Sequence, residues 1–326
     1  MKLFLGLLPS SRPDQTRIFA EIDGKLIDLQ LAYAALLWQR GQRANGYELA
    51  IFNFPATIAA FIERGEQARE ALNEVIAFAR QTGLNDLRGP ADEQIVYDIQ
   101  TIRLLPPLQN PERSFVIGFS DRARTEAMPQ PEIPTGFYKL PQNFVTSGAP
   151  VVWPKFSKEV DADGCIAIVI GKAGKRIAPE KAWEHVAGAT LMIDITARDV
   201  NRREGLTTNN LLGKNFPSST CLGPSVLIGN SRKDFEALEV ELSLDGAVKQ
   251  KFALRDCVFT VEQIIARWSM VGLKPGDWLA IGASMARQGN RLQQPVPLTI
   301  GSTLRCAAPA IGDLSHQVVS AGGLRR

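Results

Sequence analysis

Short runs rich in apolar and β-branched residues recur along most of the second half of the chain, and they predict short β-strands. A helical period interrupts the strands twice, at 179–186 and at 260–271, where Thr260-Val-Glu-Gln263 has the form of a capping box. Because strands are many, helices few and βα alternation absent, the pattern predicts a mixed β-roll or β-sandwich. The expected strands are 115–119, 165–170, 189–195, 225–228, 238–244, 249–254, 278–281 and 303–306.

The first hundred or so residues contain both strand-like and helix-like patterns of apolar residues, and they predict a small α+β unit. Residues 17–29 form two apolar runs around Asp23-Gly24, which is typical of a β-hairpin. Apolar residues then recur with helical spacing over 57–82, with Gly65 as a weak point and Gly83 as a stop. A loop rich in Pro and Asn at 105–112 marks the boundary. We therefore expect an α+β protein with domains at 1–107 and 108–326.

Composition excludes several classes of protein. The 326 residues hold 37 Lys and Arg against 34 Asp and Glu, a net charge of +3 that is too balanced for a nucleic-acid partner. The four cysteines lack the spacing of a zinc site or a disulfide framework, as expected in a reducing compartment. No apolar run approaches the roughly 18 residues of a membrane span. The first eight residues predict a strand more than a signal peptide, so we expect a cytoplasmic protein without a membrane partner.

Acidic residues occupy strand positions where burial makes them costly. Asp194 lies between Ile193 and Ile195, and a lone buried carboxylate costs several kcal/mol unless a cation, a metal or a donor meets it. We therefore predict a positive group beside Asp194. In an extended strand Asp163 and Cys165 point to the same face.

These segments resemble the fumarylacetoacetate hydrolase family. Asp163-Gly-Cys165 matches the Glu-x-Glu strand of the family, and residues 193–199 match its Asn-Asp-x-x-x-Arg-Asp strand. Lys214 and Gly223-Pro224 match the Lys and the Gly-Pro that follow. The resemblance covers roughly residues 100–305. It implies the mixed β-roll of this family, with a small N-terminal α+β domain, and a homodimer.

The resemblance also implies a divalent cation. In the family two Glu and one Asp hold Mg²⁺ or Mn²⁺, which grips a 1,3-dicarbonyl substrate and stabilises its enolate. Here Asp163 is shorter than the first Glu, Cys165 replaces the second, and Asp194 is the third ligand. Asp121 is the best candidate for a replacement ligand. We expect Mg²⁺ or Mn²⁺ to bind weakly or not at all.

The residues that would carry catalysis also depart from the family. Hydrolases of the family place a His and a Glu where this chain has Arg124 and Glu126, and arginine is no base at neutral pH. Lys214 matches the residue that binds the oxyanion or carboxylate of the substrate. We expect Lys214, Arg124 and Glu126 to be catalytic, and the substrate to be contacted by Lys139, Arg198 and Ser284.

The leading hypothesis is an enzyme that acts on a β-keto or 1,3-dicarbonyl acid through an enolate. Decarboxylation, tautomerisation, cyclisation and C–C bond cleavage all fit it, so a hydrolase and a lyase both remain open. One alternative is a non-catalytic binding or scaffolding member of the family. Another is an ordinary Mg²⁺-dependent C–C hydrolase with a rebuilt ligand set that includes Asp121.

Milder readings of single residues remain open as well. Asp194 would then be paired structurally with Arg198 or Lys214, Lys214 would be an ordinary surface lysine, and Cys165 would be a small apolar filler. The sharper reading of Cys165 is a thiolate ligand or a nucleophile.

Overall fold

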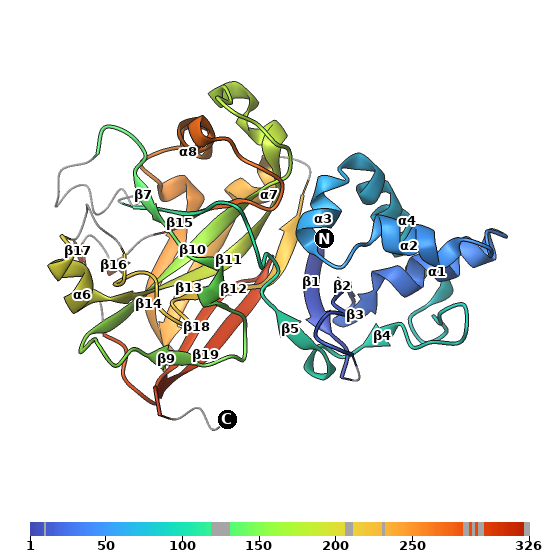
Figure 1. The fold of residues 1–326 in the computed structure, drawn as a ribbon, viewed down its shortest axis with the longest axis horizontal. Helices are drawn as coiled ribbons and strands as arrows, with labels where there is room; N and C mark the ends of the chain where they lie inside the picture. Colours follow the sequence, from blue (N-terminus) through green and yellow to red (C-terminus); the bar gives the residue numbers. More distant parts are fainter. Residues whose placement is uncertain are drawn as a thin grey trace. The chain divides into compact units, whose positions relative to one another are not determined.

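The computed structural model describes residues 1–9, 11–118, 131–205, 211–229, 232–282, 287–288, 291–292 and 297–322. The chain forms two compact units, Met1–Leu108 and Gln109–Arg326. Figure 1 shows the helices and strands of each unit.

The first unit contains an antiparallel sheet in the order β4-β3-β2-β1, with β5 also paired to β1. Asp23 and Gly24 join β2 to β3 with φ values of 50° and 76°, so the predicted hairpin is confirmed. Phe4, Phe19 and Leu26 pack together on this sheet. The strands are β1 (Lys2–Leu7), β2 (Arg17–Ile22), β3 (Lys25–Asp28), β4 (Val96–Tyr97) and β5 (Arg103–Leu105).

The helices of this unit follow from their caps and their apolar spacing. Asp28 caps the first helix by accepting a hydrogen bond from the Leu31 backbone, 3.1 Å away. The helical stretch predicted at 57–82 is divided in two by Gly65, whose φ of 63° few other residues adopt, and it ends at Gly83. The sequence pattern missed the first two helices. The elements are α1 (Leu29–Gln39), α2 (Gly46–Asn53), α3 (Ile58–Glu63), α4 (Glu66–Thr82) and the 3₁₀ helix η1 (Ile99–Thr101).

In the second unit one sheet runs in the order β12-β11-β10-β15-β6-β7, with β8 paired to β12. The pairs β15–β6 and β12–β8 are parallel and the other pairs are antiparallel. The strands are β6 (Ser114–Ile117), β7 (Gly136–Tyr138), β8 (Phe144–Val145), β10 (Val160–Ile170), β11 (Val186–Ala197), β12 (Thr220–Ile228) and β15 (Trp278–Gly282).

A second sheet, in the order β14-β13-β18-β19-β9, forms the other layer. β10 packs on β13, β11 on β18 and β12 on β19, and apolar side chains fill the space between the sheets. The predicted mixed α+β fold of the β-sandwich type is thus confirmed. The strands are β9 (Val151–Trp153), β13 (Glu239–Leu244), β14 (Ala247–Ala253), β18 (Thr303–Ala308) and β19 (Gly312–Ser320), beside a separate pair β16 (Arg287–Gln288) and β17 (Arg291–Leu292).

Short helices connect these strands. The helix predicted at 179–186 is a 3₁₀ helix that ends at His185, directly before β11 begins at Val186. The predicted capping box is confirmed: Thr260 accepts from the Gln263 backbone at 3.3 Å, and Gln263 accepts from the Thr260 backbone at 2.9 Å. The elements are η2 (Pro141–Asn143), η3 (Pro179–His185), α6 (Arg198–Arg203), α7 (Lys233–Glu236), η4 (Leu254–Asp256), α8 (Val261–Trp268) and η5 (Ser269–Val271). Within the described ranges, every helix is too short or too polar to cross a membrane.

Candidate active site

The polar residues of the candidate site lie in a row across three neighbouring antiparallel strands, β10, β11 and β12. Asp163 is directly opposite Asp194, and Asp194 is opposite Thr220. Asp161 is opposite Thr196 in the same way. Since opposed residues of antiparallel strands point to the same side, these side chains share one face of the sheet.

The other face of the same strands belongs to the core. Ala162, Ile166, Ile193 and Ile195 are buried in the apolar cluster between the two sheets. Gly164, between the two positions of the Asp-Gly-Cys motif, faces the same way, and a Cβ there would lie 3.3 Å from Cys306 Sγ. The alternation of side chains along β10 and β11 therefore places the polar residues of the candidate site on one face of the sheet and the core residues on the other.

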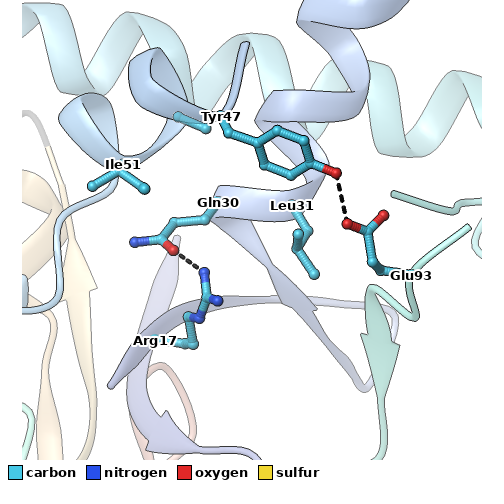
Figure 2. A pocket seen from close by; sticks show the side chains of 7 residues that line it. Arg17, Gln30, Leu31, Tyr47, Ile51 and Glu93 are labelled. Carbon is cyan, nitrogen blue, oxygen red and sulfur yellow. Dashed lines mark hydrogen bonds between the residues drawn. The ribbon is translucent and has the colours of Figure 1, made fainter. Parts of the chain in front are cut away.

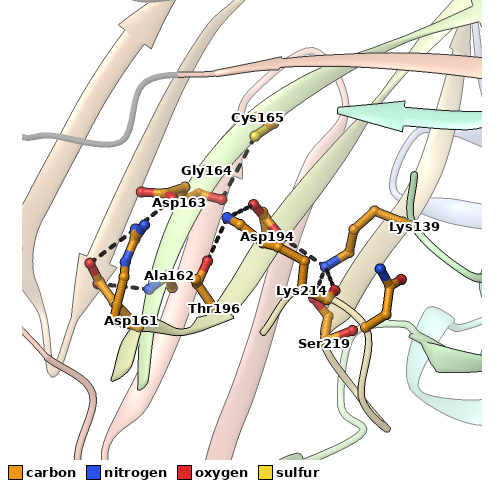
Figure 3. Close-up of polar contacts among 12 residues, drawn as sticks. Lys139, Asp161, Ala162, Asp163, Gly164, Cys165, Asp194, Thr196, Lys214 and Ser219 are labelled. Carbon is orange, nitrogen blue, oxygen red and sulfur yellow. Dashed lines mark hydrogen bonds and ion pairs between the residues drawn. The ribbon is translucent and has the colours of Figure 1, made fainter. Parts of the chain in front are cut away.

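Asp194 is held between two lysines, as Figure 3 shows. Its Oδ1 lies 2.8 Å from Lys139 Nζ, and its Oδ2 lies 2.6 Å from Lys214 Nζ. Burial alone would raise the pKa of this carboxyl, but the charges and hydrogen bonds of the two lysines outweigh it and hold the pKa below its usual value. Asp194 is thus an ionised carboxylate, and the predicted positive group beside it is confirmed.

The two lysines use their protons differently. Lys139 is fully buried, and its ammonium donates to Asp194, to the carbonyl oxygen of Ser219 at 2.9 Å and to the carbonyl oxygen of Lys214. Lys214 donates to Asp194 and to Thr196 Oγ1 at 2.7 Å. An ammonium has three N–H donors, so Lys214 retains one donor beyond these two contacts. Lys214 Nζ also lies 4.8 Å from the centre of the Phe137 ring.

A second ion-pair group adjoins the first on β10. Arg198, at the start of α6, places Nη2 2.8 Å from Asp163 Oδ2 and 3.4 Å from Asp161 Oδ2. Lys249 on β14 binds the other oxygen of Asp161. Burial raises the pKa of Asp163 against the opposing charge of Arg198. Asp163 Oδ1 is buried, and no residue in the described part of the chain hydrogen-bonds to it.

Cys165 is a buried neutral thiol. Burial and the nearby Asp194 and Asp163 charges raise its pKa well above the usual value. Its cross-strand neighbours are Met192 and Gly282, and a Cβ on Gly282 would lie 2.5 Å from the sulfur. These contacts favour the interpretation of Cys165 as a small apolar filler.

The structure brings together five of the residues predicted from the sequence: Lys139, Asp163, Asp194, Arg198 and Lys214. Asp121, Arg124, Glu126 and Ser284 lie outside the described residues, so their roles stay predictions. One of the milder readings is wrong: Lys214 is not a surface lysine, since its side chain is only 6% exposed. The ion pair of Asp194 with Lys214 is present, whereas the buried partner of Arg198 is Asp163 rather than Asp194.

The sequence reasoning missed Asp161, Thr196 and Lys249 as members of this group. Asp161 and Thr196 could have been found from the strand period, because each lies two residues from a recognised acid on the same strand. Lys249 lies on β14 of the second sheet, and no local sequence pattern predicts its contact with Asp161.

The described residues do not fit a tightly held Mg²⁺ or Mn²⁺. Both oxygens of Asp194 accept from lysines, one oxygen of Asp163 accepts from Arg198, and Cys165 offers a neutral sulfur where these ions prefer charged oxygen. Outside the undescribed segments, no group of three or more His, Cys, Asp and Glu side chains is arranged to hold a metal ion. Asp163 Oδ1 is the ligand atom that this arrangement still offers.

The first unit has a separate hollow of about 290 Å³, shown in Figure 2. Tyr47 donates to Glu93 Oε1 at 2.6 Å, and Arg17 donates to Gln30 Oε1. In these contacts the polar side chains of the hollow bind one another. We therefore place the candidate active site at the lysine–carboxylate group of the second unit.

Comparison with curated proteins finds relatives over most of the chain. The Xenopus laevis protein fahd2, a mitochondrial oxaloacetate tautomerase, is 30% identical over 279 residues, which cover 84% of this chain and 81% of that protein. The oxaloacetate tautomerase YisK of Bacillus subtilis is 29% identical over 306 residues, which cover 91% of this chain and 93% of that protein.

Solved structures share the fold. A maleylpyruvate hydrolase from Sphingobium sp. SYK-6, solved with manganese(II) and pyruvate, aligns with a TM-score of 0.69 at 20% identity over 98% of this chain and 99% of that one. A fumarylacetoacetate hydrolase from Exiguobacterium antarcticum aligns with a TM-score of 0.70 at 22% identity, covering 98% and 99% of the two chains. The family model for the C-terminal domain of fumarylacetoacetate hydrolase matches residues 116–319. This match spans most of the chain, which therefore belongs to the fumarylacetoacetate hydrolase family.

Proposed function

We propose that this protein is an enzyme that interconverts the keto and enol forms of a small β-keto acid of the oxaloacetate kind. The observation that carries the proposal is the buried ammonium of Lys214, which Asp194 and Thr196 hold in place while one of its donors remains for a ligand. The relatives that are oxaloacetate tautomerases support this choice among the possible enolate reactions.

The proposed chemistry needs a cation where negative charge develops. Removal of a proton from the carbon between two carbonyl groups sends the electron pair to a carbonyl oxygen, and that oxygen becomes an enolate. A fixed donor aimed at this oxygen in a site shielded from water stabilises the transition state. Lys214 supplies the donor, and Arg198, whose side chain is 22% exposed, supplies a second cation for a substrate carboxylate.

The proton itself must be moved by another group. The positions that the family resemblance assigns to proton transfer fall at Arg124 and Glu126, of which Glu126 is the one that can accept a proton near neutral pH. We propose Glu126 for that role and Ser284 as a further substrate contact. The homodimer implied by the same resemblance belongs to this proposal and is tested by sedimentation of the purified protein.

We further propose that turnover does not depend on a tightly bound divalent cation. The lysines and the arginine already neutralise Asp194 and Asp163, and they give the site its positive charge. A bound Mg²⁺ or Mn²⁺ would supply a Lewis acid for the carbonyl oxygens, and Asp163 and Asp194 are the described residues that would hold it.

Turnover by the Lys214→Ala variant is the direct test. The decay of the enol absorbance of oxaloacetate in the ultraviolet follows the reaction, and other β-keto acids and acylpyruvates are screened alongside. A donor to a developing oxyanion is worth about 10² to 10³ in rate, so kcat/KM should fall by that amount. Lys214→Arg should restore only part of it, because the guanidinium is planar and bulkier.

The exposed Lys181 on η3 provides the matched control, and Lys181→Ala should keep the wild-type rate. Lys214→Ala should also melt at a lower temperature, since it removes half of a buried ion-pair group, and assays are therefore run well below the transition. Wild-type protein that turns over no keto acid would refute the proposal. It would favour a non-catalytic member of the family.

A further inference from the structure

Lys139 is a buried cation whose protons are all used inside the protein. Its side chain is 0% exposed, and its three donors meet three acceptors: Asp194 Oδ1, the Ser219 carbonyl and the Lys214 carbonyl. It follows directly after β7 in the chain. With no donor remaining and no exposed surface, this ammonium is poorly suited to contact a substrate.

The three acceptors belong to two different pieces of chain. Asp194 is part of β11, whereas the Lys214 and Ser219 carbonyls mark the two ends of the segment 214–219 that leads into β12. One ammonium therefore fastens the segment that carries Lys214 to the strand that carries the counter-ion of Lys214. Figure 3 shows the ammonium groups of Lys139 and Lys214 on opposite sides of the Asp194 carboxylate.

We propose that Lys139 is a positioning residue that fixes the ammonium of Lys214 and does not touch the substrate. It holds Asp194 Oδ1, so that only Oδ2 is presented to Lys214. It also holds the backbone of Lys214 itself. This inference rests on the proposed role of Lys214 and replaces the prediction that Lys139 binds substrate.

Loss of the Lys139 ammonium would act on Lys214 in two ways. Asp194 Oδ1 would lose its donor, and the carboxylate could then turn and take a second hydrogen bond from Lys214. The Lys214 and Ser219 carbonyls would be left buried without this donor, which loosens the segment between them. Both changes move the third donor of Lys214 away from its ligand. A substitution of Lys139 should therefore lower ligand binding and activity only when Lys214 is present.

A double-mutant cycle tests this coupling. The four proteins are wild type, Lys139→Met, Lys214→Ala and the double variant, and the probe is oxalate, a planar dianion that resembles an enolate of a 2-keto acid. Calorimetry gives its affinity, and kcat/KM for oxaloacetate enol is measured in parallel. Residual turnover extends the cycle to variants whose oxalate affinity is too weak for calorimetry.

Lys139→Met should weaken oxalate binding and lower kcat/KM by about tenfold or more when Lys214 is present. When Lys214 is already alanine, the same change should alter both quantities by less than about twofold. Equal losses in the two backgrounds would overturn the proposal, because Lys139 would then act independently of Lys214. The absence of any loss in the wild-type background would overturn it as well.

Lys249→Met is the matched control, since it also removes a buried ammonium from a buried aspartate. Its effects on oxalate affinity and on kcat/KM should be the same with and without Lys214. If Lys139→Met does not fold, Lys139→Gln keeps two donors for the three acceptors and takes its place. Failure of both variants to fold would overturn the proposal, because Lys139 would then serve the fold as a whole. Wild-type protein that neither binds oxalate nor turns over a keto acid would refute the proposed function instead.

Discussion

Asp194 shows how a single buried charge organises its surroundings. A carboxylate in the interior is tolerated only when cations and donors replace its lost hydration, and here two ammonium groups do so on opposite oxygens. Removing one partner of such a group typically costs about 3–5 kcal/mol, because the remaining charge is left buried. The residue is therefore as important to folding as it is to the proposed chemistry.

His316 on β19 yields a prediction about pH. Its ring is 1% exposed, Nδ1 lies 2.7 Å from the Ala149 carbonyl oxygen, and burial lowers its pKa from 6.5 to about 4. Between these values the unfolded chain binds a proton that the folded chain does not. The free energy of unfolding should therefore fall by about 3 kcal/mol as the pH drops from 6.5 to 4, and the loss is complete below that range.

Urea unfolding at a series of pH values checks this expectation. His316→Gln should lack this part of the pH dependence, whereas His185→Gln, which changes the other histidine of the chain, should retain it. The expectation is wrong if wild type and His316→Gln lose stability equally between pH 6.5 and 4.

At the residue scale the sequence predicted the counter-ion of Asp194 correctly because the cost of burial is local. An acid flanked by isoleucines in a strand requires a cation wherever that cation comes from. It named Lys214 and Arg198 as possible partners and missed Lys139, which reaches Asp194 from a separate segment after β7. Only the folded chain brings them together.

At the scale of elements, β10 is longer than its apolar run indicates. The sequence predicts a strand from 165, but pairing with β11 continues back to Val160 opposite Ala197. The acids therefore lie within the strand, and the cross-strand register decides what they meet. The continuous apolar run marks only the second part of this strand, because polar side chains on one face interrupt the apolar signal in the first part.

The register of β10 allows a test of the divergent metal site. Wild-type protein should bind Mg²⁺ no tighter than the millimolar range, a free energy of about 4 kcal/mol. Asp163→Glu with Cys165→Glu lengthens one carboxylate and adds another on the face of Asp194, and should raise the affinity at least about tenfold, or 1.4 kcal/mol. Calorimetry with Mg²⁺ and Mn²⁺ measures both values.

The control for this test carries Asp163→Glu with Cys165→Gln, which has the same size at position 165 without the charge. It should gain little affinity. Micromolar binding by wild type would contradict the first expectation and favour Asp121 as a replacement ligand. A folded Glu/Glu protein with unchanged affinity would show that Gly282 and Arg198 leave no room for an ion.

At the scale of the whole molecule, we predict different tasks for the two compact units. The family match at 116–319 lies within Gln109–Arg326, and so does every described residue of the candidate site. The sequence places a domain boundary after residue 107 from the prolines of the loop, and the two compact units divide between Leu108 and Gln109. The two-layer fold predicted from the strand pattern is confirmed. The sequence pattern missed α1 and α2, because their buried residues follow no simple apolar stripe.

A pair of core substitutions tests this division of tasks. Phe19→Ala in the first unit removes a fully buried ring and should cost about 3–5 kcal/mol of stability while leaving kcat per folded molecule unchanged. Phe115→Ala should cost as much, and it should also lower kcat. The ring centroids of Phe115 and Tyr138 lie 4.4 Å apart, and Tyr138 directly precedes Lys139 in the chain. Denaturant unfolding and steady-state rates measure both effects. Equal effects on kcat would contradict the division.

The two-faced strands β10 and β11 have a consequence for how this site could diverge. Residues 162, 164, 193 and 195 maintain the core, and residues 161, 163, 165, 194 and 196 point to the other side of the same strands. A replacement in the second set exchanges a reactive group without opening a cavity in the first. The sheet can thus change a reactive group such as that of residue 165 by a single substitution while the packing between the two sheets is kept.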